Sequence, residues 1–185
     1  MKTFEQKKSM SRCRDCGLRE ECTRPVAPSP GEFNIAIVGE APGKTENEEG
    51  KGFVGRSGDL VWKALKPYDL TRNQFHVTNT CKCFPATTKT PTKEQIKICS
   101  EKWLFEELKE IDCRLVLAFG NTCVNAFTGK TGGIISLNGK TEWNENIGAW
   151  ICWCLHPSAV LRDPGNTKLF YEGIENFVNK IEKLY

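Results

Sequence analysis

The sequence predicts an α/β protein, a three-layer α/β/α sandwich around a central, mostly parallel sheet of four strands. Short apolar runs typical of buried strands alternate along the chain with longer segments whose apolar residues recur at helical spacing. Several runs end in glycine, asparagine or histidine, and open parallel sheets bind ligands at such strand ends. A length of 185 residues suits one domain over 1–185, with 1–30 as an N-terminal arm.

The first half of the chain supplies two strands and one helix. Residues 35–38 form a short apolar run that predicts a strand over about 34–38, and glycine and proline then predict a long, functional loop over 39–57. Inward-facing apolar residues predict a helix over about 58–66, with Ser57 as a plausible N-cap. Residues 75–79 alternate and are rich in β-formers, which predicts the second strand.

The second half continues the alternation. Thr92 and Gln95 form a capping box at the start of the next helix. The expected elements are a helix from 92 to about 108, a strand over 114–120, a helix over 121–129, a hairpin or irregular excursion over 130–149, a strand over 151–155 and a last helix over about 166–183.

Composition narrows the class of protein. The formal net charge of +3 permits a nucleic-acid partner without arguing for one. No run of 18 apolar residues exists, and residues 1–8 lack the apolar core of a signal peptide. We therefore expect a cytoplasmic, monomeric protein, free or associated with the nucleoid, that makes no membrane contact.

Ten cysteines are many for this length. Without an export signal, metal or cluster ligation explains them better than disulfides. Cys13 and Cys16 form a CxxC pair that can converge on one iron or zinc, with Cys22 six residues later. Taken alone, the pair could also be redox-active or simply consist of small buried residues.

Polar residues follow three of the predicted strands. Glu40 follows the first strand, Asn79 ends the second, and His156 follows the strand over 151–155. Because the carboxyl ends of parallel strands meet at one rim, these side chains can converge there. We expect them to close one pocket together with the loops 39–43, 53–58 and 156–162.

Four segments in this order resemble the iron–sulfur, or family 4, uracil-DNA glycosylases. They are residues 39–43 (GEAPG), 52–58 (GFVGRSG), 78–83 (TNTCKC) and 156–162 (HPSAVLR), and the resemblance spans roughly residues 13–178. It implies a monofunctional glycosylase that flips uracil out of DNA, hydrolyses its N-glycosidic bond and leaves an abasic site for base excision repair. No inserted basic, histidine-bearing loop follows Gly58, so the covalent-trapping relatives are not indicated.

The resemblance also implies a [4Fe-4S] cluster with a structural role. Its ligands would be Cys13, Cys16, Cys83 and Cys99. Four thiolates suit zinc as well, and only the resemblance favours the cluster. The other six cysteines are expected to be small buried residues, with Cys22 and Cys81 as the rival ligands; the six are Cys22, Cys81, Cys113, Cys123, Cys152 and Cys154.

By the same resemblance, three side chains form the uracil pocket. Phe53 would stack on the base, Asn79 would read its O4 and N3–H edge, and a neutral His156 would donate to O2 of the leaving base. Each side chain could instead have a purely structural role: Phe53 as a ring in the core, Asn79 as the cap of a turn and His156 as a loop histidine with its hydrogen bonds satisfied. Ala41 lines the pocket where family 1 enzymes carry a water-orienting Asp. Glu40 could orient water instead, or hold the loop by accepting backbone N–H bonds.

The flanking loops are expected to contact DNA. Val160 or Leu161 would enter the gap left by the flipped base, and Arg162 would bind a phosphate. Further phosphate contacts are expected around Pro42, Gly43, Arg56, Ser57 and Ser158.

Several positions depart from the family pattern. Asn47 follows Glu46 where an acidic pair is usual, and Phe84 follows the third cysteine ligand where Arg is usual. Gly52 replaces a Pro, and Cys154-Leu155 replaces Thr-Tyr before the histidine, which could reshape the pocket. Two alternatives therefore stay open: a relative that removes another or hypermodified base, for example from phage DNA, and an inactive nucleic-acid-binding module of the same fold.

Overall fold

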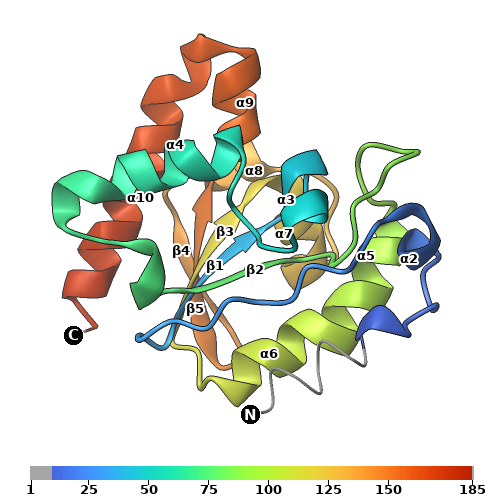
Figure 1. The fold of residues 1–185 in the computed structure, drawn as a ribbon. Coiled ribbons are helices and arrows are strands. Elements are labelled where there is room, and N and C mark those ends of the chain that lie inside the picture. Colours follow the sequence, from blue (N-terminus) through green and yellow to red (C-terminus); the bar gives the residue numbers. More distant parts are fainter. Residues whose placement is uncertain (1–9, 185) are drawn as a thin grey trace.

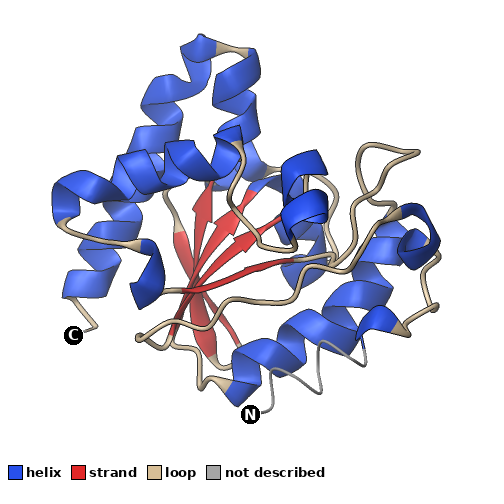
Figure 2. Cartoon of the chain, in the orientation of Figure 1, coloured by secondary structure: helices blue, strands red, loops and turns tan. Residues whose placement is uncertain are grey.

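The computed structural model describes residues 10–184, so the first nine residues of the expected N-terminal arm lie outside the described part. Its centre is a five-stranded sheet in the order β2-β1-β3-β5-β4 (Figures 1 and 2). The strands are β1 (Ile35–Gly39), β2 (His76–Asn79), β3 (Leu115–Phe119), β4 (Thr141–Asn144) and β5 (Ala149–Cys154). The pairs β1–β2, β1–β3 and β3–β5 are parallel, whereas β4 pairs antiparallel with β5.

The predicted α/β class and mostly parallel sheet are confirmed, but the predicted count of four strands is wrong by one. The additional strand, β4, lies in the segment expected to be a hairpin or an irregular excursion, and it forms a hairpin with β5. Glu142 and Trp143 of β4 are exposed on the sheet edge, so the strand carries no apolar run that could have revealed it.

Helices cover both faces of the sheet. In Figure 1, α4 and α10 lie on one side of the sheet, and α5 and α6 lie on the other. The α-helices are α2 (Leu18–Glu21), α3 (Lys44–Glu49), α4 (Arg56–Leu65), α5 (Lys93–Cys99), α6 (Phe105–Glu110), α7 (Gly120–Thr128), α8 (Ile134–Leu137), α9 (Pro157–Arg162) and α10 (Thr167–Glu182). Short 3-10 turns cover Lys66–Tyr68, Arg72–Gln74 and Pro164–Asn166.

Alternation along the strands builds two separate cores. Ile35 and Ile37 of β1 face the cluster that includes side chains of α4 and α10, whereas Ala36 and Val38 face the cluster that includes α7. Because successive strand residues point to opposite faces, both faces of a central strand must be apolar. The sheet is therefore the middle of three layers, as the sequence predicts.

Several local features differ from expectation. The segments 39–57 and 156–162, expected to be loops, contain the short helices α3 and α9. Helix α4 is preceded by Gly55 as its N-cap, so Ser57 lies inside the helix rather than at its cap. The capping box of Thr92 and Gln95 is confirmed.

The helix that begins after Thr92 is interrupted by a turn of different winding. A π-helical segment over Ser100–Leu104 joins α5 to α6, so the whole segment runs on to Glu110. π-Turns widen a helix by one residue and often occur at functional sites.

Among the described residues, no helix is both long and apolar enough to cross a membrane.

Candidate active site

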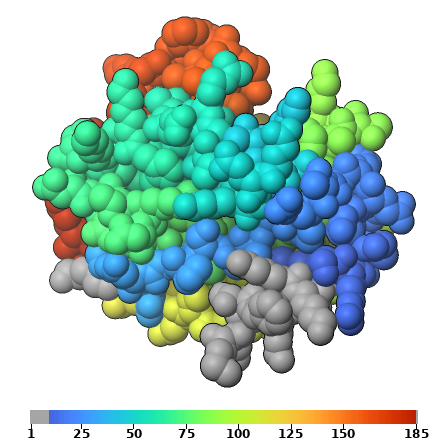
Figure 3. Space-filling model, in the orientation of Figure 1, coloured from blue at the N-terminus to red at the C-terminus, as the bar shows by residue number. Residues whose placement is uncertain are grey.

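A cavity of about 560 Å³ lies at the carboxyl ends of the parallel strands. Its volume falls in the range of about 300–1,000 Å³ that is typical of small-molecule sites. Glu40 follows β1, Asn79 ends β2, and His156 follows β5, and all three line this cavity together with Phe53. In Figure 3 the cavity opens between the orange segment around α9, the cyan segment around α3 and the yellow-green loop after residue 84.

Gly39 allows two of these side chains to approach each other. A Cβ at this position would lie 2.8 Å from Cζ of Phe53 and closer still to Oδ1 of Asn79. Gly39 and Asn79 are also register partners in the parallel pair β1–β2. The absence of a side chain at Gly39 therefore lets the aromatic ring and the carboxamide meet at the base of the cavity.

Phe53 has a backbone that is unusual for a residue with a side chain, since its φ of 55° lies in the left-handed region. Its carbonyl oxygen accepts a hydrogen bond of 2.9 Å from Nε1 of Trp62 and one of 3.4 Å from Nη1 of Arg72. The Arg72 guanidinium in turn lies 5.3 Å from the centre of the Trp62 ring. These contacts offset the cost of the strained conformation and hold the ring at the cavity.

His156 is the N-cap of α9, and its ring is held by Ser158. Nδ1 accepts the backbone N–H of Ser158 at 3.2 Å and lies 2.8 Å from its Oγ. Burial of the ring, and then the charge of Arg162, lower the pKa of His156 to about 4. The ring is therefore neutral at pH 7, and because Nδ1 accepts, its one proton is on Nε2.

Two carboxylates organise the first loop. Oε2 of Glu40 accepts a hydrogen bond of 2.6 Å from Oγ1 of Thr122 on α7. Glu46, rather than Glu40, holds the loops through backbone N–H groups: it accepts from Gly43 at 3.1 Å and from Gly55 at 2.9 Å. Sequence reasoning did not single out Thr122, because nothing local marks a hydroxyl on a helix as a partner of a distant carboxylate.

The residues expected to contact DNA surround the same cavity, with one exception. Its lining includes Pro42, Gly43, Arg56, Ser57, Ser158, Leu161 and Arg162, as well as Ala41. Val160 is 9% exposed and belongs to the core cluster under α4 and α10, whereas the Leu161 side chain is 44% exposed. Of the two candidate wedge residues, only Leu161 presents an apolar side chain to the outside.

A second, smaller cavity lies under the N-terminal arm. The four cysteines expected to bind the cluster line it together, namely Cys13, Cys16, Cys83 and Cys99. The remaining six cysteines are buried, as predicted, and all ten are free thiols. Cys22 lies beside Cys83 and Cys81 beside Cys99, but neither rival lines the cavity.

Among residues 10–184, no group of three or more His, Cys, Asp or Glu side chains lies as close together as a single metal ion would require. Four cysteine thiolates are a set of donors that suits an iron–sulfur cluster or zinc.

Contacts tie the arm that carries Cys13 and Cys16 to the rest of the protein. Nε2 of Gln95 on α5 donates to the carbonyl of Cys16 at 3.3 Å, and Lys102 pairs with Asp15. Asn47 of α3 accepts the backbone N–H of Thr23 at 2.9 Å. Asn47 therefore connects the arm to the first loop of the active site.

Comparison with known proteins agrees with this geometry. The family model for the uracil DNA glycosylase superfamily matches residues 28–180, and the chain belongs to that superfamily.

Individual relatives define the family more narrowly. The type-4 uracil-DNA glycosylase of Pyrobaculum aerophilum is 31% identical over 89% of this chain and 87% of its own length. The enzyme of the same name from Thermotoga maritima is 31% identical over 94% and 92%, and that from Archaeoglobus fulgidus 31% over 82% and 79%. Within the superfamily the chain belongs with the type-4 uracil-DNA glycosylases, which confirms the resemblance drawn from the four sequence motifs.

Proposed function

We propose that this protein excises uracil from DNA by hydrolysis and leaves an abasic site, acting as a monomeric, single-domain base excision repair enzyme. The observation that carries the proposal is the meeting of Phe53, Asn79 and a neutral, Nε2-protonated His156 in one cavity. An aromatic face, a carboxamide and a preorganised donor are what recognition and departure of a flipped uracil require.

The base is read before the bond is broken. A flipped uracil stacks on Phe53, and the Asn79 carboxamide donates to O4 while it accepts from N3–H. Cytosine presents a donor at the first position and an acceptor at the second, so one amide orientation cannot satisfy it.

Bond breaking moves the electron pair of the C1′–N1 bond onto the base, which leaves as an anion. His156 donates its Nε2–H to O2, where the charge develops. A neutral donor is suited to this task, because it stabilises the anion without having to bring a full charge into the site. A preorganised donor of this kind contributes about 3–4 kcal/mol to the transition state.

A water molecule completes the reaction by forming the new bond to C1′. Thr122 occupies one oxygen of Glu40, which leaves the other oxygen to orient the water and receive its proton. Ala41 next to it makes room for the water.

The DNA is held around the cavity. Leu161 fills the space vacated by the flipped nucleotide, and Arg162 contacts a phosphate. The loops at Pro42 and Gly43, at Arg56 and Ser57, and at Ser158 let backbone N–H groups approach the strand.

A [4Fe-4S] cluster held by Cys13, Cys16, Cys83 and Cys99 supplies a structural cross-link and no step of the reaction. The supporting observation is that these four thiols, out of ten, share one cavity. The cross-link fastens the arm to the loop that follows Asn79.

Single-turnover release of uracil from an oligonucleotide tests the proposal. We expect Asn79→Ala and His156→Ala to fold normally and to lose excision, by about 10²- to 10³-fold for the histidine. Rates near that of the unmodified protein for both variants would refute the site assignment.

A second candidate substrate class follows from Gly52. A Cβ at Gly52 would lie 3.6 Å from Nδ2 of Asn79, in van der Waals contact, so the carboxamide lacks here a contact that the proline usual in the family would make. A panel of oligonucleotides with uracil or with 5-substituted and hypermodified pyrimidines separates the two candidates. Faster release of a modified base than of uracil would favour the second.

A further inference from the structure

A buried ion pair lies behind the active site and takes no part in the reaction described above. Nζ of Lys82 is 2.8 Å from Oε2 of Glu107, and both side chains are 2% exposed. Removing two charges from water costs as much as their attraction returns, so a buried pair is weak evidence for a role in stability. The position of this pair suggests another role.

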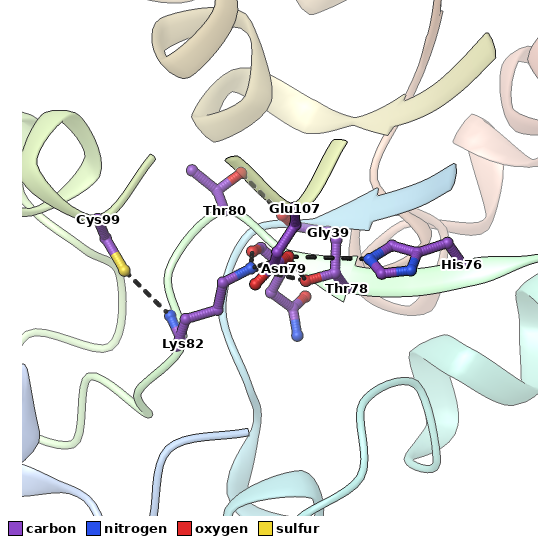
Figure 4. Close-up of polar contacts among 8 residues, drawn as sticks. All are labelled: Gly39, His76, Thr78, Asn79, Thr80, Lys82, Cys99 and Glu107. Atoms are coloured by element: carbon purple, nitrogen blue, oxygen red, sulfur yellow. Dashed lines mark hydrogen bonds and ion pairs between the residues drawn. The ribbon is translucent and has the colours of Figure 1, made fainter. Parts of the chain in front are cut away.

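All three ammonium protons of Lys82 have acceptors. Nζ donates to Oγ1 of Thr78 at 2.6 Å, to the backbone oxygen of Asn79 at 2.7 Å and to Glu107. Figure 4 shows Lys82 at the centre of this network, with Cys99 at one end and His76 at the other. The ammonium group is thus a three-point clamp on the end of β2.

The Lys82 ammonium group provides a hydrogen-bond donor for a backbone carbonyl that would otherwise lack one. After Asn79 the chain leaves the sheet, and the N–H groups of Thr80 and Cys81 turn to the carbonyls of Gly39 and Glu40, each at 2.9 Å. The carbonyl of Asn79 is left in a buried setting, where an unpaired backbone oxygen is costly. Lys82 satisfies it and thereby fixes the peptide group from which the Asn79 carboxamide extends.

The same residue also reaches the cysteine cavity. The backbone N–H of Lys82 donates to Sγ of Cys99 at 3.4 Å, and Lys82 directly precedes Cys83. One residue therefore touches a thiol of the cysteine cavity with its main chain and the base-reading strand with its side chain.

Glu107 completes the clamp from α6. Burial acts to raise the pKa of Glu107, but the Lys82 ammonium and the nearby His76 ring outweigh it, so the pKa lies below its ordinary value. Nε2 of His76 lies 3.9 Å from Oε2 of Glu107. The carboxylate is ionised at neutral pH and holds the ammonium group against β2.

We propose that Lys82 and Glu107 are positioning residues for base recognition: together they align Asn79 and connect it to the cysteine cavity. This inference rests on the proposed function, because it assigns a task to the carboxamide that reads uracil. The pair acts through Asn79 and does not touch the base.

Three variants test the role. Lys82→Met keeps the length of the side chain and removes its donors. Glu107→Gln keeps an oxygen acceptor for Nζ. The double variant Lys82→Met/Glu107→Leu removes both charges, so that no unpaired charge is left in the core. Lys109→Met is the matched control, because Lys109 forms an exposed pair with Glu106 on α6, the helix that carries Glu107.

The readouts are the single-turnover rate of uracil release, the dissociation constant for the uracil-containing oligonucleotide, the iron content and the thermal unfolding midpoint. We expect Lys82→Met to slow release by about 10- to 100-fold, as misplaced groups do, with binding and iron content nearly unchanged. Glu107→Gln should keep more of the rate, and the double variant should regain stability but not rate. Lys109→Met should match the unmodified protein.

Other outcomes would overturn the inference. A double variant that regains both stability and rate would show that the pair only balances charge. Loss of rate in strict proportion to loss of iron would show a purely structural role. If the unmodified protein does not release uracil, the proposed function fails; if it does and Lys82→Met matches it, only this inference fails.

Discussion

His156 shows how one hydrogen bond can define a chemical role. The main-chain N–H of Ser158 can only donate, so its contact with Nδ1 selects the tautomer with a proton on Nε2. The lowered pKa keeps that tautomer uncharged over the physiological range. The sequence indicated the histidine, but its protonation follows from the helix start that it caps.

The pH dependence of excision follows from this pKa. His156 is expected to stay neutral down to about pH 4, whereas an ordinary histidine would protonate near 6.5. Single-turnover rates should therefore show no loss from this group between pH 8 and pH 5, as measured in buffers of equal ionic strength. An acid limb centred near pH 6.5 that His156→Ala abolishes would contradict the assignment.

The folding stability of the protein should fall as the pH is lowered, because of the same lowered pKa of His156. Below pH 6.5 the unfolded chain takes up a proton at His156 that the folded protein does not accept until about pH 4. The contribution of this site to folding stability is thus largest at or above neutral pH and declines as the pH falls through that window. Denaturant unfolding at each pH separates this effect from the rate.

Leu161 carries a prediction of its own, because a wedge matters only when the base must leave a duplex. Leu161→Ala should lower excision from double-stranded DNA by several-fold and leave excision from a single strand nearly unchanged, as measured by uracil release from matched oligonucleotides. Equal losses on both substrates would argue that Leu161 shapes the pocket instead.

At the scale of elements, helix α3 acts as a brace between two loops. Its residue Glu46 accepts backbone N–H groups from Gly43 and Gly55, so one carboxylate fixes the loop after β1 and the loop that carries Phe53. A hydrogen bond to a charged group contributes a net of about 1.5–3 kcal/mol, and two bonds to one carboxylate do not add in full.

Glu46→Ala should therefore reduce the free energy of unfolding by about 2–3 kcal/mol and lower the excision rate, because both loops lose their anchor. Glu48→Ala, an exposed position on the same helix, should change stability by less than about 0.5 kcal/mol. Chemical denaturation measures both. Equal effects of the two variants would show that helix formation, not the brace, is what matters.

The elements that sequence reasoning found are those with buried faces. β1, β3 and β5 are apolar on both faces, β2 is buried and alternates, and the last helix carries a regular apolar stripe, so these elements could be predicted. β4 is exposed at the edge and has no such pattern. α3 and α9 have only six residues each, too few for a periodicity to show, and glycine and proline around them read as loop.

At the scale of the whole molecule, the site depends on contacts between distant parts of the chain. The motif residues could be picked out because they follow predicted strands. The residues that hold them in place could not be predicted, because they are distant in the sequence. Thr122 lies 82 residues from Glu40, and Glu107 lies 25 residues from Lys82. Such partners depend on how helices pack onto the sheet, which no local pattern encodes.

The proposed cluster would link the N-terminal arm, through Cys13 and Cys16, to Cys83 and Cys99 in the rest of the protein. Cys99→Ala should remove most of the iron and lower the unfolding midpoint, because one of four ligands is lost. Cys81→Ala should retain iron, because Cys81 is buried beside the cavity without lining it. Iron analysis and visible absorbance measure both. If Cys81→Ala lost as much iron as Cys99→Ala, the ligand set would have to be revised.

The π-turn over Ser100–Leu104 limits where the sequence of this helical segment can change in length. It separates Cys99, at the cysteine cavity, from Glu107, which holds Lys82, and both must face the same side of one continuous helical segment. The π-turn already holds one residue more than a regular turn, and a further residue inserted into regular winding beside it would rotate one half by about 100° against the other. This segment should therefore resist insertions even where individual side chains can be exchanged.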